Sequence, residues 1–78
     1  MIAVLTLSIR SAREPQLVRA YGWSTIQREL RGYLAANNLR DAAAVYGSIH
    51  DETGKLVGHF QGLGNKAFSV RRYVDDAQ

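Results

Sequence analysis

The segment "WSTIQRELRGYLAANNL", residues 23–39, decides the fold because it carries the strongest helical pattern in the chain. Its apolar side chains recur on one helical face, at Ile26, Leu30, Tyr33 and Leu34. A helix with one apolar face packs that face against another apolar surface. The segment therefore predicts an amphipathic helix that covers one side of a core.

The two ends of this helix can also be predicted. Ser24 is a suitable N-cap residue, and Gln27 three positions later completes a capping box. At the other end, Asn38 can adopt the left-handed conformation that ends many helices. That conformation would bring Leu39 against Leu34, which is the contact typical of a Schellman ending.

Upstream of the helix, the sequence predicts two strands. Residues 2–9 are apolar on both faces, which is typical of a central strand whose two sides are at least partly covered. A polar break follows at residues 10–15, and residues 16–21 form a short second strand. We expect Tyr21 and Trp23, which come just before the helix, to close the end of the core.

Downstream of the helix, the sequence predicts three more strands. Residues 42–50 and 55–61 flank the turn sequence "DETG". Residues 67–74 alternate Phe68, Val70 and Val74 with polar side chains, and Arg72 interrupts the apolar side. The period of two predicts a last strand that is buried on one side.

The register of the "DETG" hairpin has two solutions. A four-residue loop pairs Ile49 with Leu56 and Val45 with Phe60, so that all four share one face. A three-residue loop with a bulge suits the glycine, Gly54, better but mixes the two faces. Because burial of a face usually dominates, the four-residue loop is favoured.

Together these elements predict an α+β fold, with a small antiparallel sheet of about four or five strands and one helix packed across one face. The expected order along the chain is β-β-α-β-β-β. A length of 78 residues suffices for one domain at most, so we expect residues 1–78 to form a single domain. Residues 75–78 are expected to be a frayed tail.

The amino-acid composition indicates the cellular compartment in which the protein is expected. The chain has no cysteine, so neither disulfides nor thiolate metal ligands are available, and a reducing cytosol is expected. The apolar N-terminal stretch of about nine residues is far shorter than the ~20 residues of a membrane-spanning helix. We therefore expect a cytoplasmic protein that does not enter membranes.

The stretch "GHFQGLGNKAFSVRRY", residues 58–73, contains the spacing G-x-G-x-x-A of a dinucleotide-binding loop. That loop must lead directly into a helix, whereas "KAFSVRRYV" alternates as a strand does. The same segment resembles one strand of the RNA recognition motif, but that fold needs two helices and the sequence predicts one. The glycines are therefore interpreted as a connection between two strands.

The residue types that carry catalysis or bind metals are not grouped in the sequence. In the favoured register, His50 and His59 lie about four residues apart along the ladder, roughly 13 Å, which is too far for one metal ion. No pair of carboxylates is placed for acid–base work. We expect no enzymatic activity, no cofactor and no bound metal.

Two surfaces are candidates for binding a partner. The first is the polar side of the sheet, with Tyr46, His50, Lys55, His59 and Gln61. The second is a basic and aromatic set with Arg10, Arg13, Lys66, Arg71, Arg72 and Tyr73. The net charge of +3 is mild, so scattered solvation of the arginines stays an alternative.

The preferred hypothesis is a non-enzymatic protein-binding module that occupies a site on a larger protein or ribonucleoprotein complex. By analogy of size and architecture, its concrete form is a phage- or plasmid-type inhibitor of a host defence system, such as an anti-CRISPR protein. Two alternatives stay open: a small basic nucleic-acid-binding protein or regulator, and a structural protein that forms a homodimer through its sheet edges.

Overall fold

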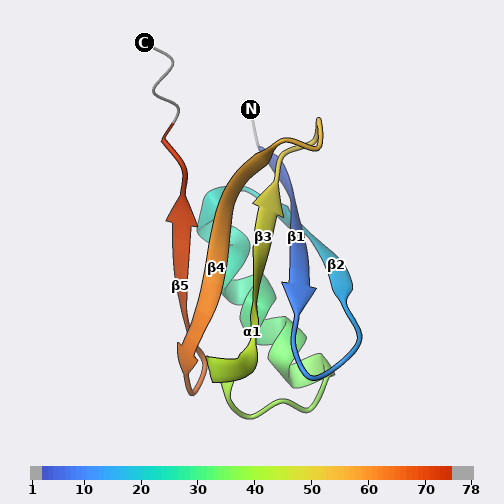
Figure 1. Ribbon diagram of the computed structural model, residues 1–78, viewed down its shortest axis with the longest axis vertical. Coiled ribbons are helices and arrows are strands. Elements are labelled where there is room, and N and C mark those ends of the chain that lie inside the picture. Colours follow the sequence, from blue (N-terminus) through green and yellow to red (C-terminus); the bar gives the residue numbers. More distant parts are fainter. Residues whose placement is uncertain (1–2, 75–78) are drawn as a thin grey trace.

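The computed structural model describes residues 3–74, which form a five-stranded antiparallel sheet with one α-helix behind it (Figure 1). The elements are β1 (Val4–Arg10), β2 (Gln16–Tyr21), η1 (Trp23–Thr25), α1 (Ile26–Ala36), η2 (Ala42–Ala44), β3 (Tyr46–His50), β4 (Leu56–Gly64) and β5 (Ala67–Arg72). The strand order in the sheet is β2-β1-β3-β4-β5. The predicted α+β fold and its element order are confirmed, whereas the predicted tail at residues 75–78 lies outside the described residues.

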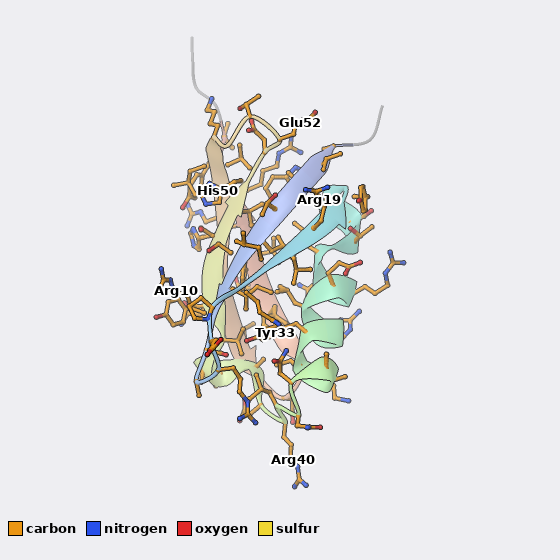
Figure 2. All side chains as sticks on the ribbon, turned by 90° about the vertical axis from the view of Figure 1, so that its right-hand side faces the viewer. Arg10, Arg19, Tyr33, Arg40, His50 and Glu52 are labelled. Carbon is orange, nitrogen blue, oxygen red and sulfur yellow. The ribbon has the colours of Figure 1, made fainter. Side chains whose placement is uncertain are left out.

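The core lies between α1 and the sheet, as the helical stripe predicts. Its buried members are Leu5, Leu7, Ile9, Ala20, Ile26, Leu30, Tyr33, Leu34, Ala42, Val45, Ile49, Phe60 and Phe68. Figure 2 shows Tyr33 pointing from α1 toward the sheet, where its hydroxyl lies 2.6 Å from Ser11 Oγ. Strand β1 has β2 and β3 as neighbours, so the prediction of a central first strand is confirmed.

The C-terminal end of α1 is confirmed residue by residue. Asn38 has a φ of 56°, in the left-handed region. The Leu39 N–H donates to the Leu34 carbonyl at 2.9 Å, and Leu39 packs against the core. This is the 6→1 bond of a Schellman ending, which satisfies a carbonyl that the last helical turn leaves free.

The predicted capping box at the start of the helix is wrong. A 3₁₀ turn, η1, precedes α1, and the residue at the helix start is Thr25, whose hydroxyl donates to the Gly22 carbonyl at 2.9 Å. Gln27 does not reach back to Ser24. Its amide Nε2 donates to the Phe68 carbonyl of β5 at 2.7 Å and so ties the first turn of α1 to the sheet.

The predicted strand at residues 42–50 is too long, because its first three residues form η2 instead. Asp41 Oδ1 accepts a hydrogen bond of 2.9 Å from the Ala43 N–H, which favours a helical turn there. Ala42 is buried, and its N–H donates to the Asn65 carbonyl at 2.7 Å. The 3₁₀ turn therefore closes the end of the core next to the β4–β5 turn before β3 begins.

The hairpin between β3 and β4 follows the three-residue loop rather than the favoured four-residue loop. The Asp51 N–H donates to the Lys55 carbonyl at 2.9 Å, and Gly54 has a φ of 89°. A bulge beside His50 then shifts the register by one residue, so that Ile49 pairs with Gly58. The predicted pairing of Ile49 with Leu56 is wrong, yet the bulge still restores one buried face.

The same shift changes every pair of opposite residues along the β3–β4 hairpin. On the face toward α1, each pair now combines a large side chain with a glycine. Gly47 is opposite Phe60. The Gly62 N–H donates to the Val45 carbonyl at 2.7 Å, so Val45 is not opposite Phe60 as predicted. A Cβ on Gly47 would collide with the Ser8 carbonyl oxygen of β1 and would lie 2.6 Å from the Phe60 ring. The register is therefore selected by how large and small residues alternate across the strands.

The predicted connection at residues 62–65 is shorter than expected: its glycines lie at the end of β4, beside an irregularity in the register, and only Asn65 and Lys66 form the turn. Strand β4 runs through Gly64, which has a φ of 129°, and Asn65 follows with a φ of 50°. A second register shift lies between Gly62 and Gly64. On β5, Phe68 is buried as predicted, but Val74 lies beyond the end of the strand and is 81% exposed.

The loss of stability on acidification is expected to depend in part on the Asp51 carboxylate. The Thr53 hydroxyl and the backbone N–H groups of Lys55 and Thr53 donate to its carboxylate and hold the pKa of Asp51 below the ordinary value. Because the folded pKa is depressed, this stabilisation is present above the unfolded pKa of about 3.9 and is lost as pH falls through the folded value.

We therefore expect Asp51→Asn to melt at a lower temperature than the wild type at pH 6, with a difference that shrinks as the pH approaches 2. Thermal denaturation followed by circular dichroism across that range measures the effect. A difference between the two proteins that stays constant over the whole range contradicts the assigned role of the carboxylate.

Candidate functional site

The side of the sheet opposite α1 is uncovered, and Figure 1 looks directly onto it. Figure 2 shows Arg10 and His50 on this side, pointing away from α1. We call this surface the open face and define it by Ser8, Arg10, Tyr46, Ser48, His59, Gln61, Ser69 and Arg71. Alternation along the strands puts these side chains on the side opposite the buried ones.

The strand register arranges the open face into two rows that cross the sheet from β1 to β5. The first row is Ser8, Ser48, His59 and Arg71. The second row is Arg10, Tyr46, Gln61 and Ser69. Neighbours in a row have Cβ atoms about 4.5–5.5 Å apart, so side chains from four strands form one continuous surface.

A hollow of about 480 Å³ lies in the middle of the open face. Ser8 and Ser48 face each other across β1 and β3, and their short side chains leave the space. Longer side chains rim it, namely Arg10, Tyr46, His59 and Gln61. The lining of the hollow therefore combines hydroxyl, amide and guanidinium groups with three ring-bearing residues, Tyr46, His59 and Phe60, and with the small residues Ala43 and Gly47.

The two histidines lie closer together than predicted. His59 is opposite Ser48, two residues from His50, rather than four residues along the ladder. The His59 Nδ1 lies 2.9 Å from the Tyr73 hydroxyl, and the two ring centroids are 5.5 Å apart. Among the described residues, no group of three or more histidines, aspartates or glutamates is placed to hold a metal ion.

Ser48 and His50 form a contact that sequence reasoning missed. The Ser48 Oγ lies 3.0 Å from the His50 Nε2, and the His50 Nδ1 lies 3.4 Å from the Gly54 carbonyl oxygen. A hydroxyl beside an imidazole is one part of a nucleophilic site, which also needs donors for the oxyanion. The contact also fixes the imidazole of His50 against the hairpin turn, so His50 is less available to a partner than His59.

The structure separates the two arginines at the end of β5. Arg71 is opposite His59 and belongs to the open face. Arg72 points to the other side, where its guanidinium carbon lies 5.0 Å from the centroid of the Trp23 ring. Trp23 packs against the core as predicted, whereas Tyr21 is 56% exposed. Arg72 therefore covers the end of the core.

The remaining candidates lie outside the open face. Arg13 lies in the β1–β2 loop and Lys66 in the β4–β5 turn, at one end of the sheet but at its opposite edges (Figure 1). Lys66 instead lines a surface hollow with Arg31 and Arg40 at the end of α1. Lys55 lies in the hairpin turn rather than in a strand. The five predicted basic residues therefore do not form one patch.

Two exposed residues extend the open face onto the edge strand β2: Arg19, which sequence reasoning left out, and Tyr21, which was expected to close the end of the core. Arg19 is opposite Thr6, and Tyr21 is opposite Val4. The signal was present in the alternation of residues 16–21, where Ala20 is buried and its neighbours on both sides are exposed. Pairing of the β2 or β5 edge between two copies, which the homodimer hypothesis requires, stays a prediction.

Charge is distributed unevenly between the strands and the rest of the chain. Within the part of the chain that the structure describes, none of the five strands contains an aspartate or a glutamate. Four arginines lie in strands: Arg10, Arg19, Arg71 and Arg72. The open face is thus polar, aromatic and basic, and its chemistry is complementary to an anionic surface.

Comparison with protein-family models finds no match, and comparisons with curated proteins and with solved structures find none either. Among the described residues, no helix is long and apolar enough to span a membrane.

Proposed function

We propose that the protein is a non-enzymatic binding module that acts by covering a site on a larger complex with its open face. The observation that carries this proposal is a sheet surface with arginines and exposed rings on strands that contain no acidic residue. A surface of that kind is suited to an anionic partner, and electrostatic attraction also speeds the encounter with it.

The concrete form that we propose is an inhibitor of a host defence complex, such as a CRISPR effector. Support comes from the small size of the chain and from the simple architecture of one helix behind one sheet. A ribonucleoprotein of that class also offers the negative charge that the open face would complement. Occupying such a site blocks a larger complex without any chemical step.

The test is inhibition of target binding by purified CRISPR effector complexes of several types. We expect wild-type protein to prevent target binding by at least one type and to co-elute with it. Arg10→Glu combined with Arg71→Glu should weaken inhibition on the order of 100-fold, because both charges lie on the open face and become repulsive.

The matched control is Arg28→Glu combined with Arg31→Glu, which makes the same change in net charge on exposed positions of α1. This control should inhibit like the wild type. Equal loss in both double variants would indicate a net-charge effect and contradict use of the open face. Full activity of every complex at saturating protein, without co-elution, would contradict the inhibitor proposal itself.

A further inference from the structure

The register of the sheet places a guanidinium beside a ring twice on the open face. Arg10 of β1 is directly opposite Tyr46 of β3. Arg71 of β5 is directly opposite His59 of β4. In each pair a flat ring, on which a base can stack, lies next to a cation that can bind a phosphate. The two pairs come from four different strands, so the fold itself creates them.

The rings of the open face lie in a line across the sheet. Tyr46 and His59 are diagonal neighbours on β3 and β4, a relation that corresponds to about 7–8 Å. Tyr73 continues the line, with its ring centroid 5.5 Å from that of His59. Tyr46 is 54% exposed and Tyr73 is 42% exposed, so both rings are available to a ligand. Successive flat groups could therefore stack along this line.

The hollow between the two pairs carries groups that can recognise the edge of a base. The Ser8 and Ser48 hydroxyls both donate and accept hydrogen bonds. The Gln61 amide, on the rim, also offers both functions. A planar ring that enters this hollow would lie beside the rings of Tyr46 and His59 and would have polar partners for its edge.

From this arrangement we infer that the open face binds single-stranded nucleic acid. Bases stack on Tyr46 and His59 over the hollow, and the backbone phosphates contact Arg10 and Arg71. The inference rests on the proposed function only in that both use the open face. The part of a ribonucleoprotein that the open face covers is then an exposed single strand. Arg72 takes no part, because it stacks on Trp23 on the other side of the sheet.

Single strands fit this surface better than the two other anionic partners. In a duplex the faces of the bases are stacked on each other, so exposed rings on a sheet cannot reach them. An acidic protein surface would pair with the arginines but would not use the faces of the rings. A binding affinity that depends both on an aromatic ring and on salt concentration therefore identifies a single strand as the partner.

The test is fluorescence anisotropy with a labelled single-stranded RNA of about 12 nucleotides, a length within the usual site size of such surfaces. We expect the affinity to fall at least about sevenfold between about 50 and 200 mM salt, since two phosphate contacts on a single strand give a slope of about −1.4. Tyr46→Ala should weaken binding by about 5- to 150-fold through loss of stacking.

Three further variants distinguish the contributions of the ring and of the charges from an effect on folding. Tyr46→Phe keeps the ring and should bind RNA like the wild type. Arg10→Gln with Arg71→Gln should flatten the salt slope by about 1.4, whereas Arg28→Gln with Arg31→Gln on α1 should leave it nearly unchanged. Circular dichroism should show that each variant keeps the fold, because all the substituted positions are exposed.

Three results would overturn the inference: no binding of the RNA at about 50 mM salt, equal affinity for a duplex of the same sequence, or equal affinity for polyglutamate with no effect of Tyr46→Ala. If the protein inhibits an effector complex through its open face but shows one of these results, only the nucleic-acid inference fails. If the charge-reversed open face inhibits as well as wild type, the proposed function fails.

Discussion

Gly62→Ala is expected to destabilise the protein by about 3 kcal/mol, which is a large part of the stability of a domain this small. The added Cβ would lie 1.5 Å from the carbonyl oxygen of Ala42 and 2.3 Å from its carbonyl carbon. The obstacle is backbone rather than a flexible side chain. Hydrogen bonds of 2.7 Å from Ala42 to Asn65 and from Gly62 to Val45 hold both segments in place.

The matched control is the same substitution at Gly32, on an exposed part of α1 where a Cβ would meet nothing within 4 Å. There alanine should stabilise by up to about 1 kcal/mol through its higher helix propensity. The two variants should therefore melt at least about 12 °C apart, as measured by thermal denaturation. Melting temperatures within a few degrees of each other would contradict the packing of η2 against β4.

Phe60→Ala is expected to cost about 3–5 kcal/mol, so a substantial fraction of the chain should be unfolded at physiological temperature. Phe60 is 1% exposed, and its ring lies 6.4 Å from that of Phe68 in an edge-to-face arrangement. Gly47 is opposite Phe60 and has no side chain, so no neighbouring side chain on β3 can fill the cavity that alanine leaves. Urea denaturation measures the loss.

Phe60→Leu is the control for the size of this cavity, because it keeps most of the apolar volume and should cost clearly less than Phe60→Ala. The ring also borders the hollow of the open face from below. Equal losses for leucine and alanine would mean that the aromatic shape, rather than the filled volume, matters at this position. A loss below about 1 kcal/mol for alanine would contradict the position of Phe60 in the core.

The local parts of the fold could be predicted because neighbouring residues determine them. The stripe from Ile26 to Leu34 requires only the helical period, and the ending at Asn38 and Leu39 requires only the last turn. The prediction for the start of the helix was wrong because it depends on a residue far away in the sequence. The Gln27 side chain donates a hydrogen bond to Phe68, 41 positions away, and a local sequence pattern cannot predict a partner at that distance.

The candidate site was predicted in its residue types but not in its grouping. Tyr46, His59 and Arg71 were all named from the sequence, yet their grouping depends on two registers. The bulge beside His50 makes Tyr46 a diagonal neighbour of His59, and the pairing of β4 with β5 puts Arg71 opposite His59. Arg71 and Arg72 are adjacent and chemically identical. The alternation along β5 already predicted that Arg72 lies on the apolar side, but only the position of Trp23 shows that its guanidinium covers the end of the core there.

The sequence by itself therefore determined the body and the C-terminal end of the helix, the presence of five strands and the buried helical stripe, since each depends on residue type and local period. The tertiary structure alone decided the strand order, the register and the line of rings on the open face. The physical reason is that these depend on how large residues and glycines fit across strands. Ile49 against Gly58 and Phe60 against Gly47 are such fits, and they exist only once the sheet has formed.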